Sequence, residues 1–308
     1  MTTLARPGPG ILGDMTAIGE RRTELSQFLR SRRARLTPAD VGLTTYGPRR
    51  VPGLRREELA QLAGVSVEYY VRLEQGRNPH VSDGVLDAVG RALRLDADER
   101  AYLRGLARPD RARPDAAPAA EAVRPALRRL VDAQPGPAYV CGHLTQVLAW
   151  NPLAAAVFGD FGDLPPERRT FAHLVFLDER YRALLGDSLP AKAEATVAFL
   201  RMGVGRYPDD PALASLIGTL AMKSEEFAAL WARQDVRDKG PGRHTLRHPL
   251  VGALALDFEV LHTSEPGQVL VSYLPAPGTG AEEALGLVGS WGADGARSGP
   301  AGWAADGA

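Results

Sequence analysis

The chain has 308 residues, a length typical of about two domains, and 44% of the residues are hydrophobic, as in a protein that buries a core. It carries 37 basic and 37 acidic residues and one cysteine, which excludes a highly charged disordered chain and a disulfide-stabilised scaffold. No apolar run approaches the roughly 20 residues that a membrane-spanning helix needs, so we expect no membrane partner.

The neutral total conceals an uneven distribution of charge. Residues 21–77 contain twelve arginines against six acidic residues, a local net charge of +6, so the remainder of the chain sums to −6. The total charge alone argues against a nucleic-acid partner. The basic N-terminal segment, by contrast, favours binding to nucleic-acid phosphates.

Composition also predicts where the domains begin and end. Residues 1–19 are rich in glycine and proline and predict a disordered arm. That stretch lacks the apolar core of a signal peptide, so we expect a cytoplasmic protein. Prolines and small residues at 108–123 predict a linker, and glycine and alanine at 292–308 predict a disordered tail. The expected domains cover 20–107 and 124–291.

Apolar spacing and capping residues predict five helices within 20–107. The first helix carries Leu25, Phe28, Leu29 and Leu36 on one face. In the second, from Arg55 to Ala63, we expect Leu59 and Leu62 to face inward. The last three begin at residues of capping type, namely Ser66, Ser82 and Asp96. The N-terminal domain is therefore predicted to be all-α.

Residues 55–76 have the spacing of a helix–turn–helix. Ala60 is small enough for two helices to cross closely, and Gly64 permits the sharp turn between them. Val65 fills the corner, and the Ser66 side chain can cap the second helix. All four residue types stand at the spacing of the DNA-binding motif. We therefore expect double-stranded DNA as a partner, bound by a homodimer at an operator with an inverted repeat.

A helical wheel divides the second helix of this motif into two faces. At about 100° per residue, Tyr70 and Leu73 fall on the buried side. Val67, Glu68 and Arg72 lie toward the opposite side, and we expect them to reach base edges in the major groove. Flanking and phosphate contacts complete the predicted DNA-binding set, which is Arg55, Arg56, Ser66, Val67, Glu68, Tyr69, Arg72, Arg77 and Asn78.

The second domain alternates between strand and helix signals. Residues 137–140 and 147–150 predict a hairpin that runs into a helix at Pro152. Residues 197–201 and 224–231 read as helices, 247–261 as an alternating strand, and 269–274 as a last strand. Strands, helices and strands in this order predict an α+β domain.

Catalytic and metal-binding motifs are weak in this sequence. His244 and His248 have the spacing of two helical metal ligands, but Pro249 and the strand after it argue against a helix. Cys141 stands near His143 without an evident orienting carboxylate or amide. No phosphate-binding glycine motif is present. We therefore expect no enzyme activity, no metal and no cofactor.

The N-terminal segment resembles the XRE, or phage-repressor, family of five-helix DNA-binding domains. The stretches 28–38, 40–43 and 49–58 are similar to one subgroup, the actinobacterial regulators that carry an MmyB-like ligand-binding domain. The second domain matches that pattern at 150–152, 176–178, 197–201, Trp231 and 248–249, and departs from it around 168–170 and 185–193.

The resemblance implies a PAS-like second domain that binds a small apolar molecule, with a fatty acid as the suggested class. The candidate ligand-binding residues are aromatic, namely Tyr139, Trp150, Phe158, Phe176, Phe199, Trp231 and Tyr273. Plain core packing is the alternative interpretation of each aromatic side chain. The alternative for the whole domain is a module that only dimerises or docks a partner.

Overall fold

The computed structural model describes residues 9–44, 51, 53–78, 80–108 and 122–298. The chain divides into two compact units. The first unit consists of residues 1–117 together with two later segments, 201–211 and 233–237, and the second unit holds 118–200, 212–232 and 238–308.

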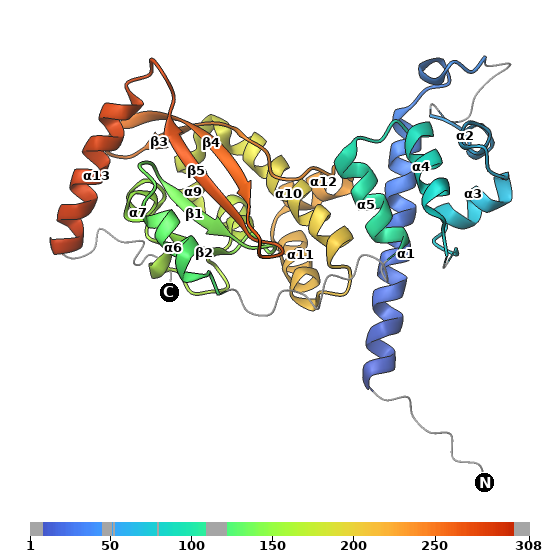
Figure 1. Ribbon diagram of the computed structural model, residues 1–308, viewed down its shortest axis with the longest axis horizontal. Coiled ribbons are helices and arrows are strands. Elements are labelled where there is room, and N and C mark those ends of the chain that lie inside the picture. Colours follow the sequence, from blue (N-terminus) through green and yellow to red (C-terminus); the bar gives the residue numbers. More distant parts are fainter. Residues whose placement is uncertain (1–8, 45–50, 52, 79, 109–121, 299–308) are drawn as a thin grey trace, which may run out of the picture. The chain divides into compact units, whose positions relative to one another are not determined.

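The first unit is helical, and its five predicted helices are confirmed. They are α1 (Pro9–Arg35), α2 (Arg56–Ala63), α3 (Val67–Glu74), α4 (Asp83–Ala92) and α5 (Ala97–Ala107), with a short 3-10 turn η1 (Ala39–Val41) after α1. The expected caps are also confirmed, because the side chains of Ser66, Ser82 and Asp96 accept hydrogen bonds from the backbone three residues later. Figure 1 shows α2–α5 arranged around the long helix α1.

Two expectations for this unit are wrong. Helix α1 begins at Pro9, so residues 9–19 are helical and not a disordered arm. No further proline occurs before Pro38, and a proline in the first turn is compatible with a helix. The Leu62 side chain is 36% exposed, because the inward face of α2 passes through Leu59, Ala60 and Ala63.

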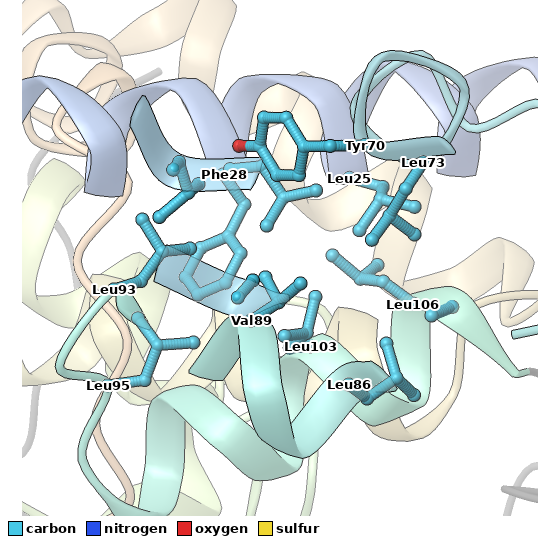
Figure 2. Packing of buried hydrophobic residues seen from close by; sticks show 14 of the residues in the cluster. Leu25, Phe28, Tyr70, Leu73, Leu86, Val89, Leu93, Leu95, Leu103 and Leu106 are labelled. Atoms are coloured by element: carbon cyan, nitrogen blue, oxygen red, sulfur yellow. The ribbon is translucent and has the colours of Figure 1, made fainter. Parts of the chain in front are cut away.

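The core of the first unit joins α1, α3, α4 and α5. Figure 2 shows Phe28 of α1 facing Val89 of α4 and Leu103 of α5 within one apolar cluster. The Phe28 and Tyr102 rings meet edge to face with centroids 5.0 Å apart. The later segment 233–237 contributes to the same core, since Val236 is buried in it.

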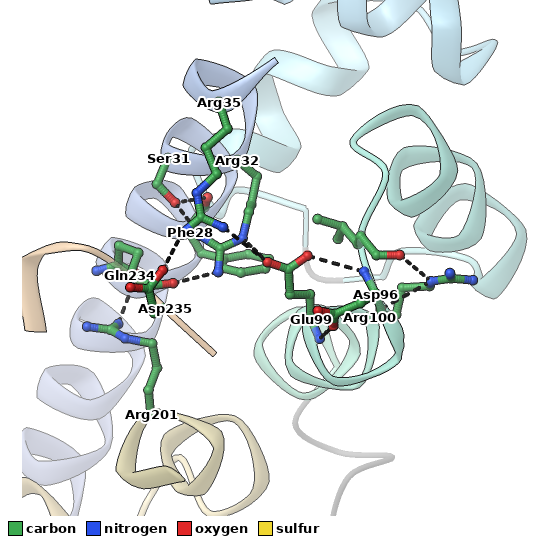
Figure 3. A network of polar contacts seen from close by, with 11 residues as sticks. Phe28, Ser31, Arg32, Arg35, Asp96, Glu99, Arg100, Arg201, Gln234 and Asp235 are labelled. Carbon is green, nitrogen blue, oxygen red and sulfur yellow. Dashed lines mark hydrogen bonds and ion pairs between the residues drawn. The ribbon is translucent and has the colours of Figure 1, made fainter. Parts of the chain in front are cut away.

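A polar network binds the two later segments of this unit to α1 and α5 (Figure 3). The Arg32 guanidinium lies 2.7 Å from the Glu99 carboxylate and donates a 2.6 Å hydrogen bond to the Gln234 carbonyl. Arg201 is fully buried, pairs with Glu24 and donates to the Gln234 side chain at 2.9 Å. Buried cations are tolerated only when they are paired in this way.

The second unit contains a five-stranded antiparallel sheet in the order β2-β1-β5-β4-β3. In chain order from residue 122, the elements are α6 (Pro125–Asp132), β1 (Ala138–Cys141), β2 (Val147–Trp150), α7 (Pro152–Phe158), η2 (Phe161–Asp163), α8 (Phe171–Leu177), α9 (Glu179–Leu185), η3 (Gly186–Ser188), α10 (Leu189–Arg206), α11 (Pro211–Lys223), α12 (Glu225–Ala232), β3 (Gly242–His248), β4 (Gly252–His262), β5 (Val269–Pro275) and α13 (Ala281–Ser298). The predicted α+β class is confirmed.

Several local expectations hold in this unit and others need correction. The predicted hairpin is β1–β2, and Asn151 caps the helix that follows it. The single strand expected at 247–261 is instead the hairpin β3–β4, with the turn at 249–251. Helix α13 continues to Ser298, so residues 292–298 of the expected tail are helical. The linker prediction at 109–121 and the predictions at 1–8 and 299–308 fall outside the described residues.

Among the residues that the structure describes, no helix is both long enough and apolar enough to cross a bilayer.

Candidate functional site

The turn between α2 and α3 is held by backbone geometry that the sequence dictates. Gly64 has a φ of 65°, in the left-handed region that favours glycine. The backbone N–H of Val65 donates to the Ala60 carbonyl at 3.0 Å, which closes α2. The Ser66 hydroxyl accepts from the Tyr69 N–H at 3.1 Å, which starts α3. The predicted helix–turn–helix geometry is therefore present.

Helix α3 has a buried face and an exposed face. Tyr70 is fully buried and Leu73 is 1% exposed, as the wheel predicts. The opposite face presents three predicted base contacts: Val67 is 43% exposed, and the exposed side chains of Glu68 and Arg72 form an ion pair of 3.4 Å one turn apart. The three side chains therefore share one solvent-facing surface of α3.

Of the remaining predicted DNA-binding residues, Arg55, Arg77 and Asn78 lie at the two ends of this motif, and Tyr69 lies within α3. Arg55 is exposed before α2, and its backbone N–H donates to the Glu58 carboxylate at 2.7 Å. Arg77 is exposed after α3. Tyr69 is half-buried on the flank, and the Asn78 amide lies 3.5 Å from its carbonyl. In the sequence, Arg55 precedes the residues of the exposed face of α3, and Arg77 and Asn78 follow them.

The structure adds one buried ionic group that sequence reasoning missed. Glu74 of α3 is fully buried and accepts hydrogen bonds from Arg33 at 3.1 Å and Arg56 at 2.9 Å. Burial by itself raises the pKa of the Glu74 carboxyl, but these hydrogen bonds outweigh it and hold the pKa below its ordinary value. Arg56, a predicted phosphate contact, is thus also an internal partner of α3.

The signal for a buried Glu74 was present in the spacing. Tyr70, Leu73 and Glu74 stand at i, i+3 and i+4, which is one face of a helix. A carboxylate on an apolar face needs cationic partners, and the arginines at positions 33 and 56 supply them.

The second unit contains an aromatic cluster that unites three predicted ligand-binding residues. The Tyr139 ring centroid lies 6.2 Å from that of Phe158 and 6.1 Å from that of Tyr273, and the last two are 5.1 Å apart. Both tyrosine hydroxyls are buried and lie 3.4 Å from each other. The cluster also includes side chains that sequence reasoning did not select, namely Phe161, Phe171, Tyr181, His244 and Phe258.

The other predicted ligand-binding residues are placed differently. Trp150 contacts the cluster through Phe161, at a centroid distance of 5.6 Å. Phe176 and Trp231 instead both pack against Phe227, with centroid distances of 5.1 and 5.7 Å. Phe199 packs beneath the Lys239 ammonium group. The ring contacts therefore divide the seven candidates into more than one group.

Polar groups border the aromatic cluster. The Lys239 Nζ donates to the Cys141 sulfur at 2.9 Å and lies 4.2 Å from the Phe199 ring centroid. The Lys192 Nζ lies 4.8 Å from the Phe171 ring centroid. Burial and the charge of Lys192 together lower the pKa of His244 to about 3, so this imidazole is neutral at pH 7.

The histidine pair considered from sequence lies on a strand. His244 and His248 both point to the buried face of β3. Among the residues that the structure describes, no three His, Cys, Asp or Glu side chains come together as a metal site.

Two protein families match parts of this chain. The family described as MmyB-like transcription regulator ligand binding domain matches residues 123–287, which is more than half of the chain. The family described as helix-turn-helix domain matches residues 24–103, which include α2 and α3. A search of curated proteins finds no match.

Proposed function

The chain belongs to the MmyB-like transcription regulators and is a DNA-binding regulator with a ligand-binding domain, and from this premise we propose how it works. A homodimer binds an operator with an inverted repeat through two copies of α3. The C-terminal domain binds a small apolar, fatty-acid-like molecule and acts by binding, without catalysis. Ligand binding changes operator affinity because the two conformational states bind the ligand with different affinities.

The exposed face of α3 carries the DNA-binding part of this proposal. Arg72 has the planar donors to bind guanine in a bidentate manner, and Glu68 can accept from the cytosine amino group. Val67 offers an apolar surface to a thymine methyl group. The flanking arginines at positions 55 and 77 are exposed and suited to phosphate contacts.

The aromatic cluster around Tyr139, Phe158 and Tyr273 supports the apolar class of ligand. Aromatic side chains give a large apolar contact area, and a few polar groups at the border can orient a bound molecule. The buried hydroxyls of the two tyrosines are polar groups within this cluster, 3.4 Å apart.

Selection of bound sites from random DNA, followed by affinity measurement on the selected site, tests the proposal. We expect an inverted repeat with half-sites about one helical turn apart and a dimer in sedimentation analysis. Saturating dodecanoate is expected to shift the operator affinity of the full chain. Unchanged operator affinity at saturation would reject the switch. If variants of the C-terminal domain lose dimerisation while the ligand has no effect on operator affinity, the domain would be a module that only dimerises or docks a partner.

A further inference from the structure

The use of lysine in this chain is unusual. Arginine supplies nearly all of the basic charge, since only three of the 37 basic residues are lysines, at positions 192, 223 and 239. Lys223 is exposed, whereas Lys192 and Lys239 are half-buried against aromatic side chains of the second unit. Two of the three lysines therefore lie against aromatic side chains of the second unit.

The surroundings of these two amines are apolar. The Lys192 Nζ stands over the Phe171 ring, and that ring packs against Tyr139 with centroids 4.7 Å apart. Lys239 stands over Phe199 and donates to the Cys141 sulfur. Among the ion pairs of the described residues, neither amine has a carboxylate partner. Both residues are half-buried, so neither is wholly enclosed by the chain.

Lysine differs from arginine in a way that fits this environment. An arginine side chain stays protonated in proteins, whereas a desolvated lysine can lose its proton and become a nucleophile. Burial, assisted by the positive charge of Lys239 and opposed by Cys141, lowers the pKa of Lys192 to about 8.

We propose that Lys192 captures an apolar aldehyde as a reversible imine, with the aliphatic part of the ligand directed toward the aromatic cluster. This inference rests on the proposed function, because it names the chemical class of the ligand. The Nζ lone pair adds to the carbonyl carbon and gives a carbinolamine. The carbinolamine hydroxyl then takes up a proton and leaves as water, while the nitrogen loses its remaining proton and the C=N bond forms. The Lys239 ammonium group, whose charge acts on Lys192, is the acid that we propose for this proton transfer.

Reductive trapping on the full chain tests this proposal. The protein is treated with octanal and sodium cyanoborohydride, and the alkylated lysines are identified by peptide mass spectrometry. At pH 7 about one in ten Lys192 side chains is neutral, against about one in 2,500 for an ordinary lysine. We therefore expect Lys192 to be alkylated more than roughly tenfold faster than exposed Lys223, which serves as an internal control.

The pH dependence of alkylation distinguishes a lowered pKa of Lys192 from simple exposure of its side chain to the reagent. Alkylation of Lys192 is expected to level off above about pH 8, whereas alkylation of an ordinary lysine, with a pKa of about 10.4, keeps rising. Lys239→Arg keeps the neighbouring positive charge and is expected to keep this plateau. Lys239→Met removes the charge and is expected to move the plateau to higher pH. Alkylation of Lys192 no faster than that of Lys223 would overturn the imine.

Two further probes distinguish failure of the imine from failure of the proposed function. Displacement of an apolar dye by 1-octanol, without trapping of octanal at Lys192, would reject the imine and leave the apolar site standing. A third outcome is that octanoate binds more tightly than octanol and that Lys192→Met abolishes this difference. The Lys192 amine would then be the partner of a ligand carboxylate, and the imine would be rejected. Binding of none of the three compounds would reject both proposals.

Discussion

At the scale of single residues, the exposed face of α3 carries the sequence-reading chemistry. The ion pair between Glu68 and Arg72 is solvent-exposed and spans one helical turn, and such pairs contribute only about 0.3–0.5 kcal/mol. Arg72 can therefore exchange its internal partner for a base edge at small cost. Tyr70 and Leu73 anchor the opposite face in the core and keep the helix in place.

Arg72→Ala tests the role of that side chain. We expect a loss of about 1–3 kcal/mol in operator binding, with relaxed preference at one base pair. Binding to the selected site and to single-base variants is measured by fluorescence anisotropy at fixed salt. Arg104→Ala is the matched control, because it removes the same charge from α5, far along the chain from α3. An equal loss on random DNA would identify Arg72 as a phosphate contact.

Glu74→Gln tests the buried carboxylate behind the recognition helix. We expect the free energy of unfolding to fall by about 2 kcal/mol at pH 7, because arginines at three positions lose their ionic partner. The folded pKa of Glu74 lies below its unfolded value, so its contribution is present above about pH 4.3 and is lost as the pH falls further. The difference between wild type and variant is therefore expected to shrink in acid. Exposed Glu57→Gln is the control in denaturant titrations.

At the scale of elements, local signals predicted those parts of the fold that local chemistry decides. Helix starts are predicted by Ser66, Ser82 and Asp96, because a side-chain oxygen at the N-cap position accepts a hydrogen bond from a free backbone N–H. Most of strand β3, residues 242–246, escaped prediction because the buried positions of the strand are His244, Leu246 and His248. With two histidines among its three inward residues, it shows almost no apolar alternation.

The close approach of two backbones within the first unit gives an element-scale prediction. A Cβ added at Gly105 would lie 2.1 Å from the carbonyl oxygen of Gly205, a backbone atom that cannot turn aside. We expect Gly105→Ala to destabilise this unit by about 1–3 kcal/mol. Gly84 of α4 has open space around its Cα, so Gly84→Ala is expected to stabilise it by about 0.5–1 kcal/mol. Thermal unfolding of both variants checks the opposite signs.

At the scale of the whole molecule, the first unit is built from three separate stretches of chain. The sequence predicted a domain that ends near residue 107, and α5 does end at Ala107. It could not predict that Arg201 and Val236 would join this unit, since Arg201 pairs with Glu24, 177 residues away in the chain, and Val236 packs in the core of the five helices. The candidate ligand residues divided into separate groups for the same reason, because aromatic type says nothing about which rings meet.

Arg201→Met tests the role of the later segments in the stability of the first unit. Removal of this buried cation leaves Glu24 with the Tyr102 hydroxyl but without its cationic partner, and we expect a loss of about 3 kcal/mol in the free energy of unfolding. Arg206→Met on the same helix removes an exposed cation and is expected to change little. Hydrogen exchange at α1 and α5 locates the effect. Equal stability of the two variants would contradict a structural role for the 201–211 segment.

The discontinuous first unit also has a consequence for synthesis of the protein on the ribosome. Its five helices are complete at Ala107, but its last segment ends at residue 237, about 130 residues later. At roughly 5–20 residues per second, the helices emerge about 6 to 26 seconds before Val236 can cover their core. During this interval the nascent DNA-binding helices lack part of their final packing. A regulator that matures in this order acquires its complete DNA-binding unit only after most of its ligand-binding domain has been made.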